Sequence, residues 1–493
     1  MKKEYKDQEA YDYVASQINK TKINSVFKPI VIDIILRRRY EYQLDDKYFH
    51  RDVESFIRNV KDIYWDDLPK KFGGNISPKE KCIRLNRNAF KENMSDEQFA
   101  EKLFSVLCHE CVHGMRFDKT RNDRTFKIDP TDKADAAIPI NGIFEIFTEK
   151  EADRLVSNRK QAEAFKYYNE TTGYRYTTKY VNAIAAAFGI KEIDLQIAAI
   201  KGEQELYEAL NANIKDEKFS KDKFKDISFN IRILHEEFLK DNSDEIDLEN
   251  LGHALRKIFG SLESILVYRI NNLEFDNLDE LKEKLEDIKL SQNAISNVMP
   301  LEKGQDDDVV EELANLGKRM VYTKAMCMEE IIKSKFKHSR SLISLVQQSD
   351  SVSEILEFMK QNGIEIDSEK LALMPEFELS QQKKDEWVEE FCGEEKDNTE
   401  RYNYIISKRE EIEKVEKRLT FVDIIEKIEG INRKVVNFLF APVIIPARFW
   451  VRKGKDLWKA LPKKEKPLLL GERRTRKNRW GQETMGGRKL EIK

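Results

Sequence analysis

The stretch LFSVLCHECVHG, residues 103–114, constrains the fold and chemistry of this 493-residue chain more than any other segment. It contains the pattern His-Glu-x-x-His. Residues four apart lie on one face of an α-helix, so His109 and His113 can offer two imidazoles to one metal ion. Glu110 lies about 100° around the helix from His109 and borders the same face, where its carboxylate can accept a proton from a water molecule. The pattern therefore predicts a helical metal site with a general base beside it.

The residues around this pattern are those of a well-formed amphipathic helix. Ser95 followed by Gln98 predicts a capping box at its start, and Gly114 predicts its end. The side opposite the two histidines is apolar and is expected to pack in the core; its residues are Phe104, Leu107, Cys108 and Cys111. This phase favours buried, unreactive thiols over the alternative of a redox or zinc-binding Cys-x-x-Cys pair.

A second helix is predicted over residues 141–153, after a loop. Its carboxylates Glu145, Glu149 and Asp153 recur every four residues and therefore share one face. One of them can complete a metal site, while the carboxylate four residues along holds a histidine ligand by a hydrogen bond. The alternative for this ladder is an ordinary solvated helix face.

Together these two helices resemble those of the gluzincins, a group of zinc metallopeptidases whose third metal ligand is a glutamate. The similarity is greatest to bacterial members whose second helix reads Asn-Glu-Gly-x-Thr-Glu; residues 144–149 here read Phe-Glu-Ile-Phe-Thr-Glu and depart from it at the first and third positions. The resemblance covers residues 75–210. It implies a Zn²⁺ cofactor, with Glu110 as the base and three ligands: His109, His113 and Glu145.

A second register of the same helix leaves the third ligand open. Glu149-x-x-Ala152-Asp153 resembles the corresponding helix of another gluzincin family and would make Glu149 the ligand. We favour Glu145, with Glu149 as the acid that follows the threonine and contacts a histidine.

The predicted fold class is α+β, with a zincin-like N-terminal domain that contains a small sheet, followed by a mostly α-helical region. Strands are predicted at residues 27–36, which are rich in β-branched side chains, and at residues 82–86, which alternate apolar and polar. A helix is predicted from Asp52 to Tyr64 and a turn at residues 73–75. The resemblance implies that the strand at 82–86 forms the sheet edge that lines the substrate cleft.

The predicted domain boundaries follow changes in residue pattern. They are 1–170 for the metallopeptidase-like domain, 171–215 for its helical continuation, 216–434 for a charged helical domain, 435–451 for an apolar segment and 452–493 for a basic tail. Leu278, Leu281 and Leu285 form a stripe typical of helix packing, whereas the charged faces are interpreted as solvated. Tyr174 and Tyr176 are interpreted as packing residues, with polarisation of a scissile carbonyl as the alternative role.

Charge and apolar runs bound the expected partners. Charged residues make up 36% of the chain and hydrophobic residues 40%, a balance typical of soluble, helix-rich proteins. The tail over residues 452–493 carries fifteen Lys and Arg against five Asp and Glu, so it suits an anionic partner such as nucleic acid or a lipid surface, or else a solvated end. The chain has no signal-like N-terminus and no run of about 18 apolar residues, and its five scattered cysteines favour a reducing compartment. We therefore expect a cytoplasmic protein without a transmembrane span.

The leading hypothesis is a zinc-dependent hydrolase that cleaves peptide bonds in protein or peptide substrates. The alternative is a non-catalytic zincin-like scaffold or adaptor that binds protein, nucleic acid or membrane through its helical half and basic tail. An intact Glu110 favours the hydrolase, because a purely structural metal site has no need of a base.

Overall fold

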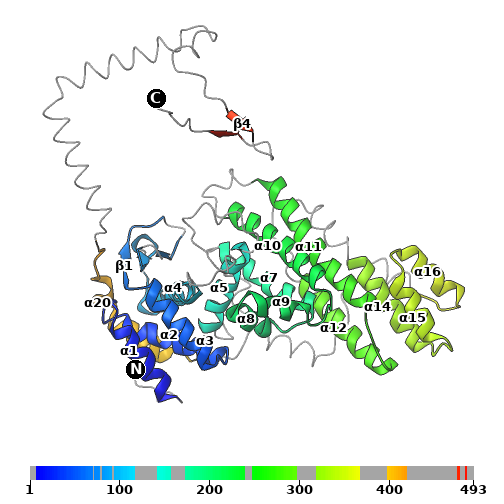
Figure 1. The fold of residues 1–493 in the computed structure, drawn as a ribbon, viewed down its shortest axis with the longest axis horizontal. Coiled ribbons are helices and arrows are strands. Elements are labelled where there is room, and N and C mark those ends of the chain that lie inside the picture. Colours follow the sequence, from blue (N-terminus) through cyan, green and yellow to red (C-terminus); the bar gives the residue numbers. More distant parts are fainter. Residues whose placement is uncertain are drawn as a thin grey trace, which may run out of the picture. The chain divides into compact units, whose positions relative to one another are not determined.

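The computed structural model describes residues 7–69, 72–77, 80–90, 94–116, 141–156, 173–238, 247–296, 318–366, 397–418, 475–477 and 483–485. The chain divides into two compact units, Met1–Lys417 and Arg418–Lys493. The first unit contains every helix that is described and the candidate site (Figure 1).

The first unit starts with three helices and a small sheet. These elements are α1 (Gln8–Asn19), α2 (Lys28–Glu41), α3 (Asp46–Asn59), β1 (Asp62–Asp66), β2 (Gly74–Ser77), β3 (Cys82–Asn86) and the short 3-10 helix η1 (Arg87–Phe90). Strand β3 is central, parallel to β1 and antiparallel to β2. The sheet is therefore mixed. Strand β2 forms the edge that contacts the next α-helix, Asp96–Arg116.

The rest of the first unit is helical in the residues described. Its helices are α4 (Asp96–Arg116), α5 (Asn141–Val156), α7 (Gly173–Phe188), α8 (Glu192–Lys201), α9 (Glu203–Asn211), α10 (Glu217–Phe238), α11 (Leu248–Asn271), α12 (Leu278–Ser296), α14 (Lys318–Lys333), α15 (Ser339–Gln348), α16 (Val352–Gln361), α19 (Thr399–Ser407) and α20 (Arg409–Glu413). The described residues are mostly helical and include this small three-stranded sheet, which confirms the predicted α+β class.

The strand predicted at residues 27–36 is wrong, because this run forms helix α2. Pro29 stands in its first turn, where a missing backbone N–H costs nothing. Residues 30–38 are all buried, so the helix is apolar around much of its circumference and shows no amphipathic period. A short apolar run of this kind does not distinguish a buried strand from a buried helix.

The helix predicted over Asp52–Tyr64 is displaced in the structure. Helix α3 starts earlier, where the Asp45 side chain accepts a hydrogen bond from the Tyr48 backbone N–H, and it ends at Asn59. Tyr64 lies instead in β1. The turn predicted at 73–75 is also wrong from Gly74 onward, since this residue begins β2, and the strand at 82–86 is therefore central rather than at the edge.

One hydrophobic cluster is shared by the helices α1, α2, α3 and α4 and by the three-stranded sheet. It includes Phe56, Ile83, Phe104 and Leu107, and it also takes in Ile405 of α19. Trp65 of β1 donates a hydrogen bond to the carbonyl of Ile412, in α20. The segment around residues 399–413 therefore belongs to the N-terminal core, and α20 lies beside the N-terminal helices in Figure 1.

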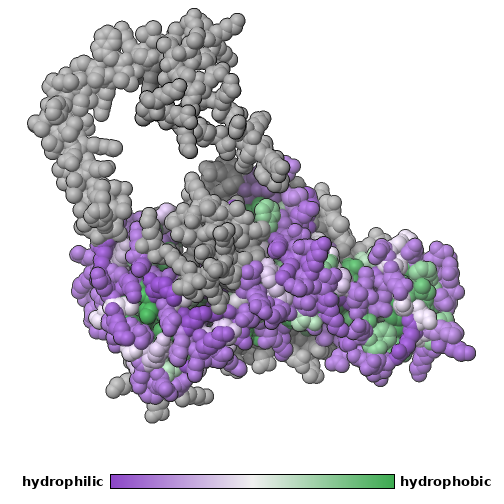
Figure 2. Space-filling model, viewed as in Figure 1, coloured by the Kyte–Doolittle hydropathy of each residue, from purple (hydrophilic) through white to green (hydrophobic). Residues whose placement is uncertain are grey.

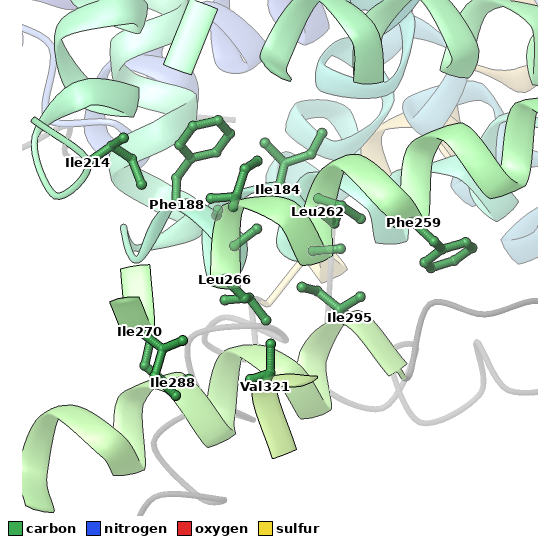
Figure 3. Packing of buried hydrophobic residues seen from close by; sticks show 14 of the residues in the cluster. Ile184, Phe188, Ile214, Phe259, Leu262, Leu266, Ile270, Ile288, Ile295 and Val321 are labelled. Carbon is green, nitrogen blue, oxygen red and sulfur yellow. The ribbon is translucent and has the colours of Figure 1, made fainter. Parts of the chain in front are cut away.

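A second cluster fills the helical half of the unit. Figure 3 shows Ile184 of α7, Leu262 of α11, Ile295 of α12 and Val321 of α14 around one interior. Leu281 and Leu285 are fully buried in it and Leu278 packs at its margin, which confirms the predicted leucine stripe.

The described residues on the face shown in Figure 2 are largely hydrophilic, with apolar side chains scattered among them. No described helix combines the length and the apolar character needed to cross a bilayer. The apolar segment predicted at 435–451 lies outside the described residues.

The second unit is described only at two short strands. Thr475–Lys477 (β4) pairs antiparallel with Glu483–Met485 (β5), within the predicted basic tail.

Candidate metal centre

Helix α4 presents the two histidines of the motif on one side and its apolar residues on the other. The Gln98 backbone N–H donates to Ser95 Oγ and the Ser95 N–H donates to Gln98 Oε1, which confirms the predicted capping box. Phe104, Leu107, Cys108 and Cys111 are fully buried in the core, as predicted. Burial also raises the pKa of the Cys111 thiol well above its usual range, which keeps it protonated.

The predicted end of this helix at Gly114 is wrong, because α4 continues to Arg116. A Cβ on Gly114 would lie 3.0 Å from Phe56 Cδ2 and 3.1 Å from Val60 Cγ2. In addition, Asn59 donates a side-chain hydrogen bond to the Gly114 carbonyl. Glycine is required at this position by the close approach of α3, and not by a change of backbone direction.

Helix α5 packs against α4 and directs two of its carboxylates at the histidines. Glu145 and Glu149 lie on this side, whereas Ile143, Phe144, Ile146 and Phe147 are buried in the helical core. The departures from the gluzincin pattern at Phe144 and Ile146 thus fall on side chains that pack away from the histidines.

Three ligand-type atoms converge between α4 and α5. His109 Nε2 and His113 Nε2 lie 3.0 Å apart. Glu145 Oε2 lies 3.2 Å from His113 Nε2 and 4.0 Å from His109 Nε2. A tetrahedral ion with bonds of about 2.0–2.2 Å requires ligand atoms about 3.3 Å apart, so these three atoms are spaced to hold a small metal ion.

Glu149 takes a different place from Glu145. Its Oε2 lies 2.6 Å from Nδ1 of His109, on the far side of the ring from Nε2. A carboxylate at Nδ1 holds the proton on that nitrogen, so a metal at Nε2 would displace only the Nε2 proton. The structure therefore assembles Glu145 with the two Nε2 atoms and uses Glu149 to orient His109.

The electrostatics of the cluster favour a cation. Burial is the largest single influence and lowers the pKa of His109, but Glu149, Glu110 and Glu145 together outweigh it and raise this pKa to about 10. Three carboxylates around two imidazoles leave an excess of negative charge that a cation can neutralise.

Glu110 lies beside the cluster and is buried. Burial raises the pKa of its carboxyl group above the usual value, while His109 and His113 oppose the shift. The edge strand passes close to it, because a Cβ on Gly74 would lie 3.3 Å from Glu110 Cγ. A carboxylate with a raised pKa beside a metal site is well placed to accept and return a proton.

A buried ion-pair network behind the site was missed in the sequence. Glu151 of α5 pairs with Arg38 of α2 and with Arg116 of α4, and Arg38 also pairs with Asp52 of α3. Burial raises the pKa of Glu151, but the two guanidinium groups outweigh this and lower it below its usual value. Three consecutive arginines that directly follow the apolar run at 30–36 were the available signal, since a helix buried so deeply must also bury some of these charges.

Tyr174 and Tyr176 fall in the first turns of α7, where the helix is described but their side chains are not. Asp153, the last carboxylate of the ladder, is not among the three residues grouped as a metal site in the described part of the chain.

Comparison with known proteins adds nothing to this geometry: no family model, no curated protein and no solved structure matches the chain. The resemblance to gluzincins therefore stays a prediction that rests on the residues of α4 and α5.

Proposed function

We propose that this protein is a zinc-dependent peptide-bond hydrolase of gluzincin type. The observation that carries the proposal is the convergence of His109 Nε2, His113 Nε2 and Glu145 Oε2 at distances of 3.0, 3.2 and 4.0 Å. Two imidazole nitrogens and one carboxylate oxygen are a donor set that zinc prefers in catalytic sites, where a fourth position stays open.

Different residues would have different roles around such an ion. When bound, zinc polarises a carbonyl and lowers the pKa of a coordinated water towards neutrality. Glu149 holds His109 in the orientation that directs Nε2 to the site. Glu110 accepts the proton of the attacking water and returns it to the leaving amine, a role that its raised pKa favours.

The outer edge of strand β2 is the proposed binding place for the substrate. Among the described residues, strand β2 pairs only with β3, and it runs past Glu110 at Gly74. An extended peptide that adds to the outer edge of β2 would lie beside the base, with backbone hydrogen bonds holding it. Protein or peptide segments in extended conformation are accordingly the proposed substrates.

The test combines metal content with cleavage. Elemental analysis of purified protein should give one zinc per chain for the parent and none for His113→Ala. Glu110→Gln should retain zinc but cleave at least about 100-fold more slowly, measured as new N-termini in a library of unfolded proteins. A parent without zinc after reconstitution contradicts the proposal, as does equal cleavage by parent and Glu110→Gln. Zinc binding without any cleavage would favour the non-catalytic scaffold.

A further inference from the structure

Helices α4 and α5 pack through apolar side chains and are also linked by polar contacts, of which the metal site is the first. The second is the buried network in which Glu151 of α5 pairs with Arg116 of α4 at 2.5 Å. Glu151 also pairs with Arg38, which holds Asp52 of α3 in turn. The side chains of Glu151, Arg38 and Asp52 are 0%, 2% and 4% exposed and that of Arg116 is 9% exposed, so the network is largely shielded from solvent.

The metal site and the ion-pair network contact different sides of α5. At about 100° per residue, Glu151 lies about 120° around the helix from Glu145 and about 160° from Glu149. Apolar packing already restrains α5, since Phe147 lies in one hydrophobic cluster and Leu155 in the other. Directional ion pairs on a second side can fix the remaining rotation of α5 relative to α4.

Ion pairs are a poor choice for stability at such a position. The cost of removing charges from water offsets most of their mutual attraction, and apolar residues of similar volume stabilise a core at least as well. Guanidinium–carboxylate pairs differ in that their hydrogen bonds are directional and fix the relative orientation of the groups. The arrangement therefore fits a role in geometry better than a role in stability.

We propose that Arg38, Glu151 and Arg116 form a clamp that positions the metal ligands, by holding α5 at the rotation in which Glu145 meets His113 and Glu149 meets His109. The three act through the two helices and stand apart from the cluster of ligand atoms, so they are positioning residues. The inference rests on the metal site proposed above and adds the device that preorganises it.

The test compares two variants of the same network. Glu151→Gln keeps the size of the side chain but removes the charge that anchors α5. Asp52→Asn is the matched control, because it removes a carboxylate from the same Arg38 but on the α3 side. Both variants should unfold at lower urea concentration than the parent.

Only the first variant should change the metal site. For Glu151→Gln we expect about 10- to 100-fold weaker Zn²⁺ binding in chelator competition, with altered visible absorption of the Co²⁺-substituted protein. Asp52→Asn should keep the parent spectrum and bind Zn²⁺ within about threefold of the parent. Glu151→Asp, which keeps the charge, should recover part of the affinity.

Parent-like Zn²⁺ affinity and Co²⁺ spectrum in Glu151→Gln would overturn the clamp and leave the proposed function standing. Equal losses of affinity in Glu151→Gln and Asp52→Asn would also overturn it, since the effect would then follow stability. If Glu151→Gln does not fold, Arg116→Gln serves instead, because it removes the α4 anchor and leaves the Arg38 pairs in place. A parent that binds neither ion would overturn the proposed function and the clamp together.

Discussion

Two carboxylates one turn apart on α5 have different roles at the residue scale. Glu145 directs its Oε2 at both Nε2 atoms, while Glu149 contacts His109 at Nδ1. Which of the two completes the site is open in the sequence, because both registers of the helix offer a glutamate. The crossing of α4 and α5 brings Glu145 close to both Nε2 atoms, and a sequence pattern does not contain that crossing.

Substitution of each glutamate should separate the two roles. Glu145→Gln removes a ligand and should weaken Zn²⁺ binding more than about 100-fold, whereas Glu149→Gln should weaken it about 10- to 100-fold. Chelator competition measures both, with Asp153→Asn as a control that we expect to change little. A larger loss for Glu149→Gln than for Glu145→Gln would reverse the assignment.

Gly114 gives a prediction that involves no metal. A Cβ there would meet the Phe56 ring and Val60 at 3.0–3.1 Å. We expect Gly114→Ala to lower the free energy of unfolding by about 1–3 kcal/mol in urea titrations, because α3 must move away.

Gly252 of α11 is the matched control for this substitution, since a Cβ added there would meet no described atom within 4 Å. Gly252→Ala should raise the free energy of unfolding by about 0.5–1 kcal/mol, as expected for alanine in a helix interior. A neutral or stabilising Gly114→Ala would show that α3 and α4 are not as tightly packed as the distances indicate.

At the scale of elements, the sequence predicts amphipathic helices well and buried elements poorly. Helix α4 is recognisable because its capping box and its apolar face agree with each other. The run that forms α2 reads as a strand because burial on most sides removes the period that identifies a helix. The edge strand β2 escapes prediction because its four residues, Gly-Asn-Ile-Ser, are typical of turns and become a strand only by pairing with β3.

Charged residues on the later helices are predicted to be solvated, and Lys324 of α14 is an exception. It is fully buried and donates hydrogen bonds to Asn271 Oδ1 of α11 and to the Gln347 carbonyl of α15. Burial lowers its pKa to about 8. The lysine thus joins three helices through a charge that the folded state disfavours.

This shift predicts a pH dependence of stability. Between about pH 8 and 10.5 the unfolded chain still binds the proton that the folded chain has lost, so stability rises with pH over this window. The free energy of unfolding of the parent should rise by up to about 3 kcal/mol relative to Lys324→Met, which cannot titrate there. Urea titrations at several pH values measure the difference, and parallel pH profiles of the two proteins would contradict it.

At the scale of the whole molecule, the N-terminal core is completed by a segment from far along the chain. Arg401 of α19 forms an ion pair with buried Asp33 of α2, and Tyr402 packs edge-on against Phe104 of α4. Arg409 pairs with Asp96 at the start of α4 at 2.6 Å. Nothing in the local sequence indicates this return, since contacts over such separations leave no periodic signal.

Truncation of the chain tests how much α19 and α20 contribute to the stability of the N-terminal core. A chain of residues 1–417 keeps α19 and α20, so it should bind zinc like the parent and unfold cooperatively. A chain of residues 1–396 leaves Asp33 buried without Arg401, and we expect it to lose about 3 kcal/mol or more of stability. Urea titration and elemental analysis compare the two, and equal stability and zinc content would contradict the prediction.

The late position of α19 and α20 has a consequence for how the protein is made. A ribosome adds about 5–20 residues per second, so about 10–40 s separate the completion of α9 from that of α20. During this interval the nascent chain has α4 and α5 but lacks the segment that packs on Phe104 and pairs with Asp33. The N-terminal core is therefore completed only after the helical half of the chain has been made.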